Sequence, residues 1–184
     1  MKIVVFAGSR MPKDEHTILD IKTFGQKMAQ ENFDIAYGGG NGGVMGIVAN
    51  EAQINGSHVT AVVVDKYAHE KQLDNIDIYT AKNDLERFEK MMAQPDVVAC
   101  IVFPGGPGTV REAFSALEKA VYEKGVPILL PENFSISSNI WNTFQTSLAE
   151  GFINQDFKGS MKFISQKDNL TDVLNIKKTN QLKV

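Results

Sequence analysis

Short apolar runs rich in β-branched residues alternate with longer amphipathic stretches, and this alternation constrains the fold more than any other feature. The apolar runs occupy residues 3–7, 33–37, 59–64, 97–103 and 126–130. Helical patterns fill the intervals, at residues 17–31, 43–55, 85–93, 109–123 and 139–150. Nearly continuous apolar strands that alternate with helices are typical of a parallel sheet covered on both faces. We therefore expect an α/β fold with a doubly wound, mainly parallel sheet.

Weaker signals extend this pattern toward the C-terminus. A short extra strand is expected near residues 76–80, a further strand at 161–165 and a helix at 170–175. The polar residues 177–184 are expected to form a frayed tail. A chain of 184 residues without repeats or linkers suits a single domain spanning residues 1–184.

The composition argues against several classes of partner. The formal net charge of -3 provides no electrostatic footprint for nucleic acid or an anionic membrane. No segment approaches the length needed to span a bilayer, and the apolar run at the N-terminus is too short for a signal peptide. We therefore expect a cytoplasmic protein.

The cysteine and the histidines suggest neither a disulfide nor a metal site. Cys100 is the single cysteine and lies inside an apolar run, so we interpret it as a buried structural thiol and not as a nucleophile. The three histidines are scattered without the spacing of metal ligands. No metal is therefore expected.

Small or glycine-rich segments follow three of the expected strands, at residues 8–10, 38–43 and 104–109. In open parallel sheets, ligands bind outside the carboxyl ends of the strands. Glycines let backbone N–H groups approach a phosphate closely, and the N-terminus of a following helix favours an anion. None of these loops fits a Walker A motif or a dinucleotide fingerprint. Together they favour a nucleotide site of another kind.

Two interpretations of Thr109 and Glu112 remain open on the residues alone. Thr at the N-cap and Glu three positions later would form a capping box that satisfies backbone donors. Alternatively, the glycine-rich segment 104–108 would place the Glu112 carboxylate beside a phosphate-binding loop. A capping box alone does not require so much glycine.

Several motifs resemble those of the LOG family, the cytokinin riboside 5′-monophosphate phosphoribohydrolases that are often labelled lysine decarboxylases. PGGPGTVRE at 104–112 resembles the family signature PGGxGTxxE, and YGGGNGGVMG at 37–46 resembles YGGGxxGLMG. The turn at 8–10 resembles the family's first-strand GSS or GSR, and EGFI at 150–153 its late EGFI segment. The resemblance covers nearly the whole chain. It implies a Rossmann-like fold, a homodimer, and release of the base from a nucleoside 5′-monophosphate such as AMP or N6-prenylated AMP.

The resemblance also implies roles for particular residues. The family motif RKxxM corresponds to residues 87–91, where Arg87 and Met91 match and Phe88 replaces the usual Lys. Glu112 is the candidate catalytic carboxylate, and Arg87 the candidate to bind phosphate or ribose oxygens or to orient Glu112. The candidate substrate-binding residues are Ser9, Gly39, Gly40, Gly43, Glu70, Gly105, Gly106, Gly108 and Thr109. Met45 and Phe88 are candidates to face the base, although apolar residues at such spacing more often belong to a core.

Hydrolysis of an N-glycosidic bond requires no cofactor. Lysine decarboxylation would require pyridoxal phosphate and a buried lysine, and the surroundings of Lys90, the lysine nearest the glycine loops, do not suggest one. Two other functions remain open: a non-catalytic nucleotide- or cofactor-binding protein on the same scaffold, and a nucleoside deoxyribosyltransferase.

Overall fold

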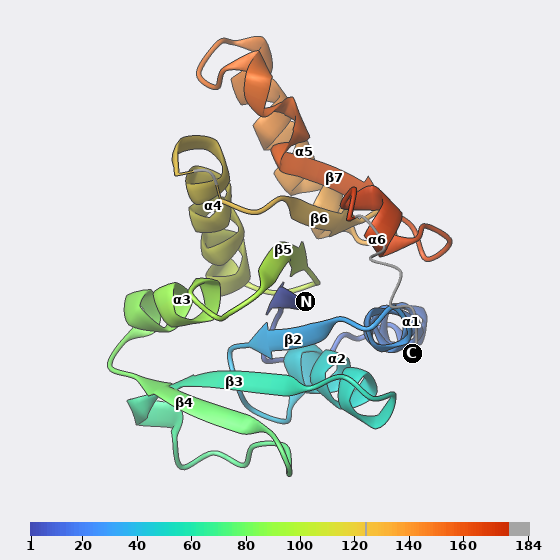
Figure 1. The fold of residues 1–184 in the computed structure, drawn as a ribbon, viewed down its shortest axis with the longest axis vertical. Helices are drawn as coiled ribbons and strands as arrows, with labels where there is room; N and C mark the ends of the chain where they lie inside the picture. Colours follow the sequence, from blue (N-terminus) through green and yellow to red (C-terminus); the bar gives the residue numbers. More distant parts are fainter. Residues whose placement is uncertain (124, 177–184) are drawn as a thin grey trace, which may run out of the picture.

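Seven parallel strands form one sheet in the order β4-β3-β2-β1-β5-β6-β7 (Figure 1). The computed structural model describes residues 1–123 and 125–176. The strands are β1 (Lys2–Phe6), β2 (Asp34–Tyr37), β3 (Val59–Val64), β4 (Asp77–Ala81), β5 (Val97–Val102), β6 (Ile128–Pro131) and β7 (Met161–Ile164). The helices are α1 (Glu15–Gln30), α2 (Gly43–Ile54), α3 (Asp84–Met92), α4 (Pro107–Tyr122), α5 (Ser135–Ala149) and α6 (Leu170–Val173). The expected fold class is therefore confirmed.

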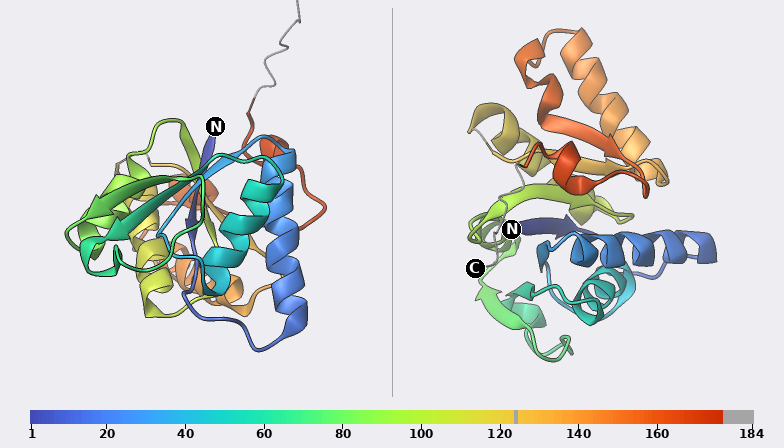
Figure 2. Two further views of the ribbon diagram at one scale, coloured as in Figure 1. Left: turned by 90° about the horizontal axis from the view of Figure 1, so that it is seen from below. Right: turned by 45° about the vertical axis from the view of Figure 1, so that its right-hand side comes forward.

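Helices cover both faces of the sheet because the central strands present apolar side chains alternately to each side. Ile3 and Val5 of β1 pack in one core cluster with residues of α1 and α2. Val4 and Phe6 pack in the other cluster with residues of α3, α4 and α5. Figure 2 shows α1 and α2 grouped together, apart from α4 and α5.

The expected elements all occur, with differences of up to four residues at their ends, the largest at the helix expected from residue 139, which begins at Ser135. The helix expected from residue 17 begins at Glu15, because the Asp14 side chain accepts a hydrogen bond from the Thr17 amide and caps the first turn. Two short 3-10 helices, at Asp65–Tyr67 and Gln155–Ser160, were not expected. The expected frayed tail at 177–184 lies outside the described residues.

The strand order reverses direction at β1, which lies between β2 and β5. At this point the loops after β1 and β5 meet: the Gly8 amide donates to the Pro104 carbonyl at 2.9 Å, and the Phe103 amide donates to the Phe6 carbonyl at 2.8 Å. Such a switch point is the usual ligand site of doubly wound sheets.

Within residues 1–123 and 125–176, no helix has the length and apolar character required to cross a membrane.

Candidate active site

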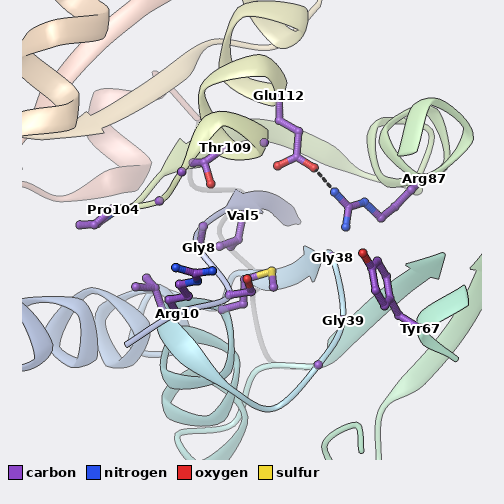
Figure 3. A pocket seen from close by; sticks show the side chains of 18 of the residues that line it. Val5, Gly8, Arg10, Gly38, Gly39, Tyr67, Arg87, Pro104, Thr109 and Glu112 are labelled. Atoms are coloured by element: carbon purple, nitrogen blue, oxygen red, sulfur yellow. Dashed lines mark hydrogen bonds and ion pairs between the residues drawn. The ribbon is translucent and has the colours of Figure 1, made fainter. Parts of the chain in front are cut away.

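A pocket of about 820 Å³ opens at the switch point (Figure 3). Its walls come from the loops after β1, β2, β3 and β5 and from the first turns of α3 and α4. This volume falls in the range of sites that enclose small ligands. The pocket therefore brings together segments that are up to about a hundred residues apart in the sequence, such as residues 8–12 and 104–109.

The loop between β5 and α4 can lie against the loop after β1 only because both contain glycine. A Cβ atom built on Gly105 would lie 2.1 Å from the Thr109 hydroxyl oxygen and 2.9 Å from the Gly8 nitrogen. Thr109 is only 4% exposed, so its side chain is closely packed against the loop. Gly105 thus permits the close packing that forms this wall of the pocket.

Helix α4 begins three residues earlier than the capping-box interpretation requires, because its N-cap is residue 106 and not residue 109. Gly106 is the N-cap and Pro107 occupies the first helical position, where its lack of an N–H is harmless. Thr109 and Glu112 therefore lie inside the helix, and the capping-box interpretation is wrong. Gly106 has no side chain to cap the amides of the first turn, so those of Gly108 and Thr109 remain available at the pocket wall.

Glu112 and Arg87 form an ion pair at the wall of the pocket. Arg87 Nη2 donates to Glu112 Oε1 at 2.6 Å, and the two side chains are 15% and 7% exposed. Burial raises the pKa of Glu112 above its ordinary value, and the Arg87 charge opposes this rise. Asp84 Oδ1 lies 3.5 Å from the same Arg87 nitrogen. Glu112 is therefore a desolvated carboxylate held in one orientation by a guanidinium.

The sequence of this chain is similar to those of known phosphoribohydrolases and matches a family model over most of its length. The family described as "Possible lysine decarboxylase" matches residues 45–174, and curated relatives carry LOG names. The chain belongs to the LOG family. It is 29% identical over 160 residues to the probable cytokinin riboside 5′-monophosphate phosphoribohydrolase LOG4 of Oryza sativa subsp. japonica, covering 83% of this chain and 66% of that protein. It is 27% identical over 158 residues to the phosphoribohydrolase LOG3 of Arabidopsis thaliana, covering 83% and 72%.

Solved structures agree on the fold. The molybdenum cofactor binding protein of Rippkaea orientalis aligns with a TM-score of 0.66 at 18% identity, covering 95% of this chain and 93% of that one. The molybdenum cofactor carrier protein of Chlamydomonas reinhardtii gives 0.64 at 19% identity, covering 96% and 99%. At such identities the likeness concerns the fold alone.

The structure gathers all but one of the candidate site residues around one pocket. The residues lining it include Arg87, Glu112, Ser9, Gly39, Gly40, Glu70, Gly105, Gly106, Gly108 and Thr109. Gly43 does not line the pocket. Its φ of +61° and the absence of a Cβ let it pack against the backbone of Ser9, because a Cβ there would lie 2.3 Å from the Ser9 carbonyl carbon. Gly43 therefore supports the pocket indirectly, by allowing the start of α2 to pack against the backbone of Ser9.

Phe88, the departure from the LOG motif, does not face the pocket. It is 4% exposed, and its ring stacks on Phe6 with 6.0 Å between centroids. Of the two candidates to face the base, Met45 lines the pocket and Phe88 belongs to the core. Replacement of the usual LOG lysine by phenylalanine therefore removes a charge from this turn of α3 and adds to the packing beneath the sheet.

Sequence reasoning missed four pocket residues with polar or charged side chains. Arg10 belongs to the first-strand turn, to which the motif resemblance assigns no charged role, and Asp84 lies just before the helix expected at 85–93. Tyr67 and Gln72 come from the irregular segment after β3, where no periodic pattern marks them. The Gln72 side-chain oxygen accepts a hydrogen bond from the Gly40 amide, which ties this segment to the glycine-rich loop after β2.

Cys100 and Lys90 were expected to take no part in catalysis, and their positions agree with this expectation. Cys100 is fully buried in β5, and burial raises the pKa of its thiol, so its interpretation as a structural residue is confirmed. Lys90 Nζ lies on the exterior, 2.7 Å from the Thr80 carbonyl oxygen and 2.8 Å from Glu86. A Schiff-base lysine would be buried in the pocket. In the part of the chain that the structure describes, no three metal-ligating side chains gather.

Proposed function

We propose that this protein hydrolyses the N-glycosidic bond of a nucleoside 5′-monophosphate, AMP or an N6-modified AMP, to the free base and ribose 5-phosphate. The observation that carries the proposal is the buried Glu112 carboxylate, fixed by Arg87 at the wall of a pocket that also contains the N-terminus of α4. The names of the curated relatives support the same reaction.

The reaction breaks the bond between C1′ and the base nitrogen, and the transition state places positive charge on C1′ and the ring oxygen. A carboxylate beside these atoms stabilises that charge and accepts a proton from the attacking water, as in glycoside hydrolysis. The water oxygen bonds to C1′, and the base leaves with the electron pair and takes up a proton. Glu112 is the group that would act in this way.

Arg87 acts on the substrate through Glu112. Its guanidinium is paired with Glu112 at 2.6 Å and lies near Asp84, so it orients the carboxylate and favours the ionised form. Of the two roles considered for Arg87, the geometry supports the orienting role.

The 5′-phosphate would bind at the start of α4. Gly105, Gly106, Gly108 and Thr109 line the pocket there, and helix amides together with the Thr109 hydroxyl suit an anion. A phosphate at this wall and a carboxylate one turn further along the helix would bracket the ribose.

Substitution of Glu112 tests the proposal. Glu112→Gln keeps the shape of the side chain and an oxygen for Arg87, but an amide cannot act as a general base. We expect a near-native melting temperature and loss of base release from AMP, by at least about 100-fold. Free base and ribose 5-phosphate would be measured by chromatography over a panel of nucleoside 5′-monophosphates.

Glu118→Gln is the matched control, because Glu118 is an exposed carboxylate on the same helix outside the pocket. Retained turnover in Glu112→Gln would remove Glu112 from the mechanism. A wild-type protein that binds AMP without releasing base would instead be a nucleotide-binding module. Transfer of the sugar to an added second base would identify a transferase.

We also propose that the protein acts as a cytoplasmic homodimer, as the family resemblance implies. Sedimentation velocity at micromolar concentration would measure the oligomer, and a single monomeric species would contradict it.

A further inference from the structure

The charged side chains of the pocket do not together attract an anion, so binding of a phosphate depends on whether one of the two arginines is free to pair with it. Five charged side chains line it: Arg10, Glu70, Asp84, Arg87 and Glu112. Three are carboxylates and two are guanidiniums, so their formal sum is -1 when all are ionised. A phosphate dianion entering such a pocket requires a cation that is still available to bind it.

Arg87 is not such a cation, because its charge is already shared between two carboxylates. Its Nη2 lies 2.6 Å from Glu112 and 3.5 Å from Asp84. Arg87 Nε is buried without a hydrogen-bond partner among the described residues, but a phosphate bound there would draw the same positive charge away from Glu112 and weaken the interaction that orients the catalytic carboxylate.

The charge of Arg10, unlike that of Arg87, is not neutralised by a neighbouring carboxylate of the described chain. Its side chain forms no ion pair or hydrogen bond with other side chains or backbone groups among residues 1–123 and 125–176. Figure 3 shows it directed into the pocket across from Thr109, on the side away from the Arg87–Glu112 pair. It is exposed at the pocket mouth, so a ligand can reach it directly.

The backbone that carries Arg10 is held firmly although its side chain is unpaired. The Gly8 carbonyl accepts a hydrogen bond of 3.1 Å from the Met45 amide, and a Cβ on Gly43 would lie 2.6 Å from the Arg10 nitrogen. The start of α2 therefore fixes the position of residues 8–10. The guanidinium of Arg10 extends from this fixed base toward the N-terminus of α4.

We propose that Arg10 binds the 5′-phosphate opposite the α4 amides and makes the site selective for phosphorylated over unphosphorylated nucleosides. This inference rests on the proposed function for the choice of ligand. A guanidinium presents two parallel donors to phosphate oxygens, so Arg10 on one side and the helix amides on the other enclose the anion. Arg10 lies away from Glu112, so it contributes to binding and KM more than to kcat.

Equilibrium binding separates this role from catalysis. In a Glu112→Gln background, where AMP is not consumed, we expect Arg10→Ala to raise the Kd for AMP and for ribose 5-phosphate by about 10- to 100-fold. The Kd for adenosine should change less than about twofold, since adenosine lacks the charged group. Arg10→Lys should restore part of the affinity, because it keeps the charge without the planar fork.

Lys13→Ala is the matched control: it removes a positive charge from the same loop, but Lys13 is exposed and outside the pocket lining. It should leave both affinities unchanged. Raising the ionic strength should weaken AMP binding in the parent more than in Arg10→Ala, because the phosphate contact is exposed to screening.

Unchanged AMP affinity in Arg10→Ala, equal losses for AMP and adenosine, or an equal loss in Lys13→Ala would overturn the inference. So would a parent protein that binds neither AMP nor ribose 5-phosphate. Base release by the wild-type protein is measured separately. If release is absent while Arg10→Ala still weakens AMP binding selectively, the proposed hydrolysis fails and the role of Arg10 stands.

Discussion

At the scale of single residues, the Arg87–Glu112 pair sets the protonation state of the proposed base. Burial raises the pKa of Glu112, while Arg87 and, to a smaller extent, Arg111 lower it. A general base must be ionised, so activity should rise as the pH rises through the pKa of Glu112. The acidic limb of the pH profile therefore lies above the ordinary glutamate range.

Arg87→Met should move that acidic limb to higher pH. The substitution removes the positive charge that most strongly lowers the pKa of Glu112, so the carboxylate needs a higher pH to ionise. Profiles of kcat/KM against pH, recorded for wild type and variant, provide the measurement. The variant should also be slower at every pH, because the carboxylate loses its orienting partner.

Arg111→Met is the control for this shift. Arg111 is exposed and contributes less than Arg87 to the pKa of Glu112, so its removal should move the limb by a smaller amount. Coincident acidic limbs for wild type and Arg87→Met would show that Glu112 is not the group that the profile reports.

At the scale of elements, two glycines near the start of α4, Gly105 before the N-cap and Gly108 in the first turn, have opposite expected effects on stability. Gly105→Ala would place a Cβ 2.1 Å from the Thr109 hydroxyl oxygen, so we expect a loss of about 1–3 kcal/mol in the free energy of unfolding. Base release should fall as well, because the loop after β5 must move. Urea unfolding followed by circular dichroism provides the stability measurement.

Gly108→Ala serves as the comparison three residues further along the chain. A Cβ on Gly108 meets nothing within 4 Å and the residue is already helical, so stability should be unchanged or increased by up to about 1 kcal/mol. If both substitutions destabilised the protein equally, the close packing of Gly105 against Thr109 would not be what requires glycine there.

The same element shows where sequence reasoning succeeded and where it failed. The apolar pattern of residues 109–123 predicted the body of α4, because periodic burial identifies a helix interior. The start was misplaced, since Thr109 and Glu112 fit a capping box by spacing alone. Pro107 at the first helical position was the signal that could have corrected it. The segment after β3 was unpredictable in detail, because Tyr67 and Gln72 are positioned by contacts and not by periodicity.

At the scale of the whole molecule, the strand order explains why the site forms where it does. The sequence predicted that the three glycine-rich segments share one edge of a parallel sheet, but the order of the strands could not be read from it. Placing β1 beside β5 brings residues 8–10 against residues 104–109. The two cations of the pocket consequently come from opposite sides: Arg10 from the loop after β1, and Arg87 from α3.

A ligand that bridges these segments should stabilise the whole domain against unfolding. At about 100 times its Kd, a ligand that binds only the folded state adds about 2.7 kcal/mol, which for a chain of this size corresponds to a rise in Tm of roughly 5 to 10 °C. In scanning calorimetry of the Glu112→Gln variant, we expect AMP to raise the Tm by this amount. Adenosine at the same concentration should raise it much less. Adding Arg10→Ala should abolish most of the difference between the two ligands. Equal shifts for both ligands in the Glu112→Gln parent would mean that the phosphate makes no contact across the switch point.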